Sequence, residues 1–251
     1  PGPEPAAPDP ASAGRTLLEP HLGPLLQTGP FASLGEHLDF ELALLTLRLR
    51  RQVARLRARH RFREDPFRGL YVRDEDVDQL LGGEPAAADD DPNHAPPGPG
   101  ECDTAGTGGQ QATAAALTEA IEALLAAREQ RLAATRAAGA EPPLFDLALR
   151  FGLGSIETQL VVIALAPEVD LVYETLYGYV QNDVTRRHPT VALACELLSP
   201  EEGSPLALRT WLAPDAPLRR QGLLRLVADP QDRDPPLAAR SLRLVDRVVD
   251  H

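Results

Sequence analysis

The stretch LFDLALRFGLGSIETQLVVIALAPEVDLVYETLYGYVQNDVTRRHPTVALACELL at 144–198, continued by WLAPDAPLRRQGLLRL at 211–226, decides the fold. Short apolar segments alternate there with turn residues, a pattern that predicts compact packed helices. We expect these helices near 144–151, 155–166, 171–183, 189–198 and 201–212. Apolar segments at 223–227 and 242–245 predict two short strands. The region over 142–251 is therefore predicted to be a helical domain that carries a small β-hairpin.

Two longer helices are predicted ahead of this domain. The first covers about 36–61, and its apolar residues fall three or four positions apart, on one stripe. They are Leu38, Leu42, Leu45, Leu49, Val53 and Leu56. The second covers about 112–138, and Gly139 follows it as a stop signal. Because each apolar stripe needs a partner, we expect the two helices to pack as an antiparallel hairpin.

Composition changes along the chain divide it into regions. Residues 1–35 are rich in Pro and Ala and are expected to be disordered or irregular. Residues 36–81 and 112–140 form the predicted helical hairpin region, including a short helix that starts at Asp74. Between them, 82–111 combines three consecutive acids with prolines and glycines, which indicates a flexible linker.

Charge and composition exclude several functions. The formal net charge is −12, which argues against unaided binding to polyphosphates. All 25 basic residues are arginine, so the lysine of a nucleotide-binding P-loop and Schiff-base chemistry are both ruled out within this chain. Two cysteines, Cys102 and Cys195, favour a reducing compartment over a structural disulfide. With no membrane-length apolar segment or signal pattern, we expect a cytoplasmic protein.

Arginine clusters are the main candidates for binding. Eight arginines lie between positions 48 and 63 without an intervening acid. They either form a solvated helix face paired with glutamates of the second helix (Glu119, Glu122 and Glu129), dock an acidic protein, or contact nucleic acid. A second cluster precedes the helix at 189–198. The predicted partner-binding residues are Arg48, Arg51, Arg55, Arg59, Arg186 and Arg187.

In a winged helix, the turn before 189–198 would lead into the helix that DNA-binding proteins use for base recognition. Its sequence VALACELL offers Glu196 but no Arg, Asn or Gln to read bases, so we favour packing and protein contact. No catalytic, cofactor or metal site is predicted. The six histidines have no zinc-ligand spacing, and Cys195 has no activating partner nearby in the sequence.

Extended phrases in the chain resemble a known bacterial family. They are GLYVRDEDVDQLL at 69–81, ALAPEVDLVYETLYGYVQNDVTRRHPTVALACELL at 164–198, APDAPLRRQGLLRL at 213–226 and RSLRLVDRVVDH at 240–251. Together they resemble the N-terminal, winged-helix-containing region of AAA+ ATPases, including those associated with extracellular contractile injection systems. The resemblance implies that an ATPase module follows this region in the intact protein, and that this module binds ATP and Mg²⁺ and forms oligomers.

The sequence therefore predicts a mainly α protein, with a long helical hairpin and a winged-helix-like domain that ends in a short β-wing. We expect a non-catalytic regulatory or adaptor domain that docks a protein partner, such as a contractile-injection component or a cargo protein. The alternative is a winged-helix DNA-binding regulator.

Overall fold

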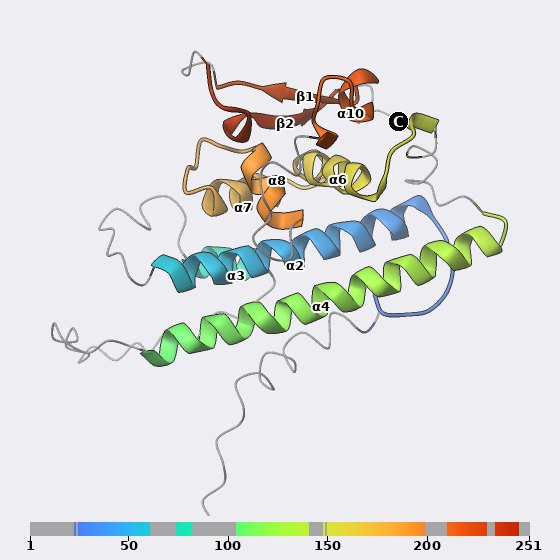
Figure 1. Ribbon diagram of the computed structural model, residues 1–251. Helices are drawn as coiled ribbons and strands as arrows, with labels where there is room; N and C mark the ends of the chain where they lie inside the picture. Colours follow the sequence, from blue (N-terminus) through green and yellow to red (C-terminus); the bar gives the residue numbers. More distant parts are fainter. Residues whose placement is uncertain are drawn as a thin grey trace, which may run out of the picture.

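Two long antiparallel helices form the base of the molecule, as predicted (Figure 1). In the computed structural model, α2 spans Leu34–His60 and α4 spans Thr104–Ala137. The structure describes residues 23, 25–60, 74–81, 104–140, 148, 150–198, 210–229 and 234–245. One apolar cluster joins the two helices, and it contains Phe31, Phe40, Leu44, Leu47, Leu117, Ala120, Ile121, Leu124 and Leu132.

Helix α4 ends where Gly139 was predicted to stop it. The Gly139 amide donates to the Arg136 carbonyl, and the Ala140 amide donates to the Thr135 carbonyl. This pair of bonds is the Schellman arrangement, which requires a left-handed residue after the helix. Gly139 has φ +74°, a conformation that glycine adopts without the strain a Cβ brings.

The predicted flexible linker at 82–111 was placed too far along the chain. Helix α4 already begins at Thr104, so residues 104–111 are helical despite the glycines in this segment. Each glycine costs about 1 kcal/mol relative to alanine in a helix. Extending a helix that the Ala- and Leu-rich segment has already nucleated adds a hydrogen bond per residue, which offsets this cost.

A second group of helices covers the opposite side of α2 (Figure 1). It comprises α3 (Asp74–Leu80), α6 (Ser155–Val169), α7 (Val172–Val180) and α8 (Val191–Leu198). The predicted stripe residues Leu45, Leu49 and Val53 of α2 enter a single cluster with apolar residues of these four helices. Helix α2 is therefore buried on two sides, and the predicted hairpin and the predicted C-terminal domain share a core.

The β-hairpin closes the fold above α6 and α8. Strand β1 (Leu224–Val227) follows the short helix α10 (Pro217–Arg220), and β2 (Ser241–Leu244) follows the 3₁₀ turn η1 (Leu237–Ala239). The strands are antiparallel, with Leu224 opposite Leu244 and Leu226 opposite Leu242. Thr190 forms an isolated bridge with Ser241. Both predicted strands are confirmed within one residue, and so is the mainly α fold with a small wing.

Other predictions are partly outside the described residues. The helix predicted at 171–183 is shorter, because Asn182 takes a left-handed conformation with φ +52° after α7. Most residues of the two helices predicted at 144–151 and 201–212 lie outside the described part of the chain, and so do all residues of 246–251. Within the predicted irregular segment at 1–35, the described Phe31 is fixed in the core, and its amide donates to the Thr135 hydroxyl at 2.9 Å.

Candidate functional site

Helix α8, which the sequence placed in the position of a recognition helix, is buried by α2. Five of its eight residues are buried, and only Glu196 is fully exposed. The Gln52 side-chain amide of α2 donates to Glu196 at 2.5 Å, and the Arg51 guanidinium donates to the Leu197 carbonyl at 3.2 Å. In this arrangement α8 presents little surface with which to enter a DNA groove.

Two arginines of the α2 cluster face inward. Arg48 and Arg51 are only 5% and 2% exposed. Burial lowers the pKa of both guanidinium groups to about 10. The sequence pattern was interpreted as a surface, but α2 carries apolar residues on two sides and has little surface to offer. Neither residue is available to a partner in this fold.

The remaining arginines of this cluster differ in their surroundings. Arg57 lies 2.8 Å from the Asp78 carboxylate of α3, so it joins two helices. Although burial opposes the charged form, the hydrogen bond from Arg57 to Asp78 raises the pKa of Arg57. Arg55 is half-buried, and the side chain of Arg59 lies outside the described residues. Arg57 thus pairs with an acid of α3, a contact that the sequence analysis did not predict.

The second predicted cluster lies in a braced turn between α7 and α8. The Gln181 side-chain amide donates to the carbonyls of Arg186 and His188, and its oxygen accepts from the Thr190 amide. Across the turn, Asp183 accepts from the Thr185 amide and hydroxyl. These hydrogen bonds from Thr185 lower the Asp183 pKa. The turn at 181–190 is therefore held by side chains at both ends.

Arg186 and Arg187 have different roles in this turn. Arg186 donates to the Asp183 carboxylate at 3.0 Å and so forms part of the bracing. Arg187 is 68% exposed, with Glu174 of α7 at 3.6 Å. Of the predicted binding residues, Arg187 is the one that the described structure presents most openly to solvent.

The wing carries a basic pair that the sequence analysis did not single out. Arg225 of β1 lies directly opposite Arg243 of β2, and both are exposed. Burial of His188 and the nearby Arg243 charge lower the His188 pKa, so the wing and the braced turn are neighbours. Like charges directly opposite on paired strands destabilise a hairpin, so the Arg225–Arg243 pair lowers the stability of the wing in the isolated domain.

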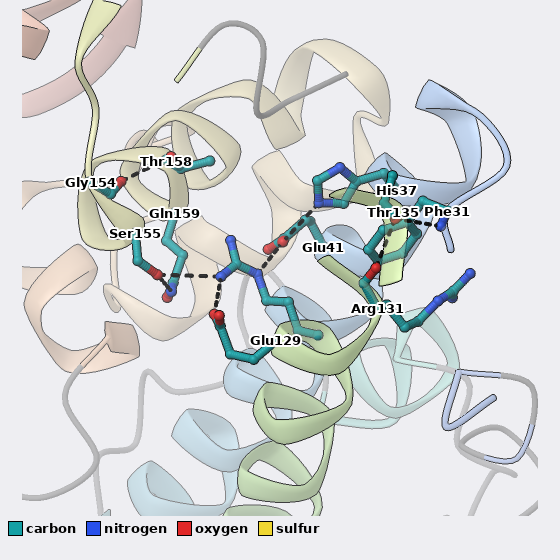
Figure 2. A network of polar contacts seen from close by, with 11 residues as sticks. Phe31, His37, Glu41, Glu129, Arg131, Thr135, Gly154, Ser155, Thr158 and Gln159 are labelled. Carbon is teal, nitrogen blue, oxygen red and sulfur yellow. Dashed lines mark hydrogen bonds and ion pairs between the residues drawn. The ribbon is translucent and has the colours of Figure 1, made fainter. Parts of the chain in front are cut away.

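A buried polar network joins α2, α4 and the start of α6 (Figure 2). The Glu41 carboxylate accepts from Arg128, and His37 Nε2 lies 3.4 Å from Glu41 Oε1. All three side chains are at most 5% exposed. Although burial opposes ionisation, the His37 and Arg128 side chains hold the Glu41 pKa below its usual range. Arg128 also reaches the Ser155 hydroxyl at 3.3 Å.

The network was not predicted, although the sequence held one signal for it. Glu41 interrupts the apolar run of α2 four residues after His37, and an acid in such a position needs a buried partner. The partner, Arg128, comes from α4, 87 residues away, and only the packing of the two helices brings it close.

Other chemistry is limited in the described part of the chain. There, no three His, Cys, Asp or Glu side chains come together in a way that could hold a metal ion. Cys195 is buried in α8, and burial raises the pKa of its thiol, which disfavours the nucleophilic thiolate. Among the described helices, none is long and apolar enough to cross a membrane.

A family model described as "Winged helix domain, variant" covers residues 23–251. No curated protein and no solved structure matches the chain.

Proposed function

Since the chain belongs to the family of variant winged helix domains, we propose that it is a non-catalytic docking domain that recognises a protein partner. In this proposal it is the regulatory or adaptor region of an AAA+ ATPase, and its partner is an injection-system component or a cargo protein. ATP and Mg²⁺ would be bound by the ATPase module and not by this region, which contains no lysine for a P-loop.

The observation that carries the proposal is the braced turn with its exposed Arg187. A cation held on a fixed turn loses little conformational freedom on binding, so it is a preorganised anchor for an acidic group. The helix that would otherwise read DNA packs against α2, which supports protein docking over base reading by this helix.

The test is a pull-down of the chain against proteins encoded beside its gene, followed by affinity measurement for the captured partner. Arg187→Glu should weaken binding about tenfold or more, or about 1.4 kcal/mol. Arg150→Glu, at an exposed residue ahead of α6, is the matched control and should bind as the unchanged chain does. Equal affinity for all three proteins would show that the turn is not the docking surface.

DNA binding remains a second candidate because of the wing. The exposed Arg225–Arg243 pair would gain from a phosphate placed between the two guanidinium groups. A labelled duplex in the same experiment tests this: binding should weaken steeply with salt and be lost in the Arg225→Glu, Arg243→Glu double variant. Salt-dependent DNA binding together with no protein capture would replace the docking proposal with a DNA-binding function.

A further inference from the structure

A pocket of about 110 Å³ lies where the second half of α4 meets the start of α6. Its lining includes His37 of α2, Arg128, Glu129 and Arg136 of α4, and Gly154 and Ser155 at the start of α6. Figure 2 shows the labelled members of this group on the three helices, with His37 and Glu41 on one side and Gly154 and Ser155 on the other.

The start of α6 presents donors that the helix itself does not use. The first amides of a helix have no partner within it, and here they are those of residues 155–157. Gly154 is the N-cap, and it has no side chain to accept from them. The other half of a capping box is present, because the Glu157 carboxylate accepts from the Gly154 amide at 2.5 Å. Within the described residues, no acceptor is recorded for the amides of 155–157.

Two side chains add donors to the same pocket. The Ser155 hydroxyl oxygen accepts from Arg128 and from Gln159, each at 3.3 Å, so its own proton is left to donate elsewhere. His37 is only 2% exposed; its Nε2 lies 3.4 Å from Glu41 Oε1, whereas its Nδ1 has no hydrogen-bond partner within the described residues. A buried nitrogen without a partner is uncommon in folded proteins and points to a ligand.

The charges around the pocket select the ligand. Arg128 and Arg136 are cationic, whereas Glu129 stands on the lining, and Glu41 and Glu157 lie just behind it. A doubly charged phosphate would meet three carboxylates with two guanidinium groups, which is unfavourable. A carboxylate carries only one negative charge, so it is opposed less than a phosphate, and its two oxygens match the donors.

We propose that this pocket binds one carboxylate group, and that in the cell this group belongs to the docking partner, as an acidic side chain or a C-terminus. The inference rests on the proposed function for the origin of the carboxylate, but not for the existence of the site. The carboxylate oxygens would accept from the amides of 155–157, from the Ser155 hydroxyl and from the His37 ring.

The test is an NMR titration of the isotope-labelled chain with sodium acetate, with sodium chloride at equal concentration as the salt control. Saturable shifts are expected at the amides of 155–157 and on the His37 ring with acetate alone. N-acetylglycine and N-acetylaspartate N-methylamide then compare a C-terminal with a side-chain carboxylate, and the tighter binder identifies the source.

A variant that supplies its own carboxylate makes the test sharper. Gly154→Asp places an acid at the N-cap, where φ −80° and ψ 179° suit any residue. Its Cβ would meet only the end of the Glu157 side chain, at 3.0 Å, and that group can move. This variant should fold and lose the acetate response. The control is Gln130→Glu, which makes the same change of charge at an exposed residue of α4 outside the pocket, and it should keep the response.

The outcomes separate this site from the docking proposal. Absence of saturable shifts, or an unchanged response in Gly154→Asp, would overturn the carboxylate site even if a partner is captured. A response that Gly154→Asp abolishes would establish the site even if the Arg187 surface binds no partner.

Discussion

The buried Arg128–Glu41 pair gives the sharpest prediction for stability. Both side chains are at most 5% exposed, and Arg128 is the guanidinium that hydrogen-bonds the Glu41 carboxylate. Removing one member of such a pair leaves an uncompensated buried charge, which costs about 3–5 kcal/mol. Arg128→Met should therefore lower the free energy of unfolding by this amount, measured by urea denaturation at neutral pH.

A second variant and a control give the cause. Glu41→Leu combined with Arg128→Met removes both charges and should cost less than Arg128→Met alone, because no buried charge is left unpaired. Arg187→Met breaks an exposed contact with Glu174 and should change stability by only about 0–1 kcal/mol. A loss below about 1 kcal/mol for Arg128→Met, or a double variant as costly as the sum of the singles, would refute the reasoning.

The pH dependence of the same pair has a definite sign. The Glu41 pKa is lower in the folded chain than its ordinary value, so the folded state favours the ionised form. The resulting stability is present above the ordinary carboxylate range and is lost as the pH falls through the folded pKa. Glu41→Gln should remove this acid-sensitive component, measured as the slope of unfolding free energy against pH.

Two further predictions concern a turn and a tyrosine. Gly139→Ala should destabilise the chain by about 1–2 kcal/mol, because a Cβ at φ +74° is strained even with open space around it. The control Gly35→Ala, near the start of α2, should not destabilise the chain. Thermal unfolding of the two variants compares their stabilities. Burial raises the pKa of Tyr177 well above its ordinary value, so the folded state favours the neutral phenol. The resulting stability is fully present below the ordinary tyrosine range and is lost as the pH rises beyond that range. In an alkaline absorbance titration one tyrosine should therefore ionise only with unfolding, and Tyr177→Phe should remove that step.

Local signals in the sequence were enough to place most of the described elements. Apolar segments located the two strands to within one residue, and Gly139 marked the end of α4. The start of α4 was missed because the glycines of this segment locally disfavour a helix. The helix extends through them because the strong helix-forming segment that follows has already nucleated it. Propensity alone does not show which of these effects prevails.

Arg48 and Arg51 of α2 were misplaced for a different reason. A single apolar stripe leaves room for a polar face, and the arginines were assigned to that face. Phe40, Leu44 and Leu47 form a second stripe toward α4, so α2 is enclosed on two sides. The sequence carried this signal in its density of apolar residues, but the burial of Arg48 and Arg51 follows only from the packing of helices distant in sequence.

The covering of α8 also limits how a winged helix domain of this form can meet DNA. For α8 to read bases, α2 would have to leave a cluster that holds its Leu45, Leu49 and Val53 and, from α8, Leu193 and Leu197. Exposing five such side chains costs roughly 7.5–15 kcal/mol, at 1.5–3 kcal/mol each. That is comparable to the whole stability of a typical domain, about 5–15 kcal/mol. Base reading by α8 is therefore disfavoured, whereas Arg225 and Arg243 of the wing are already exposed; α8 instead serves as a core helix next to the braced turn and Arg187.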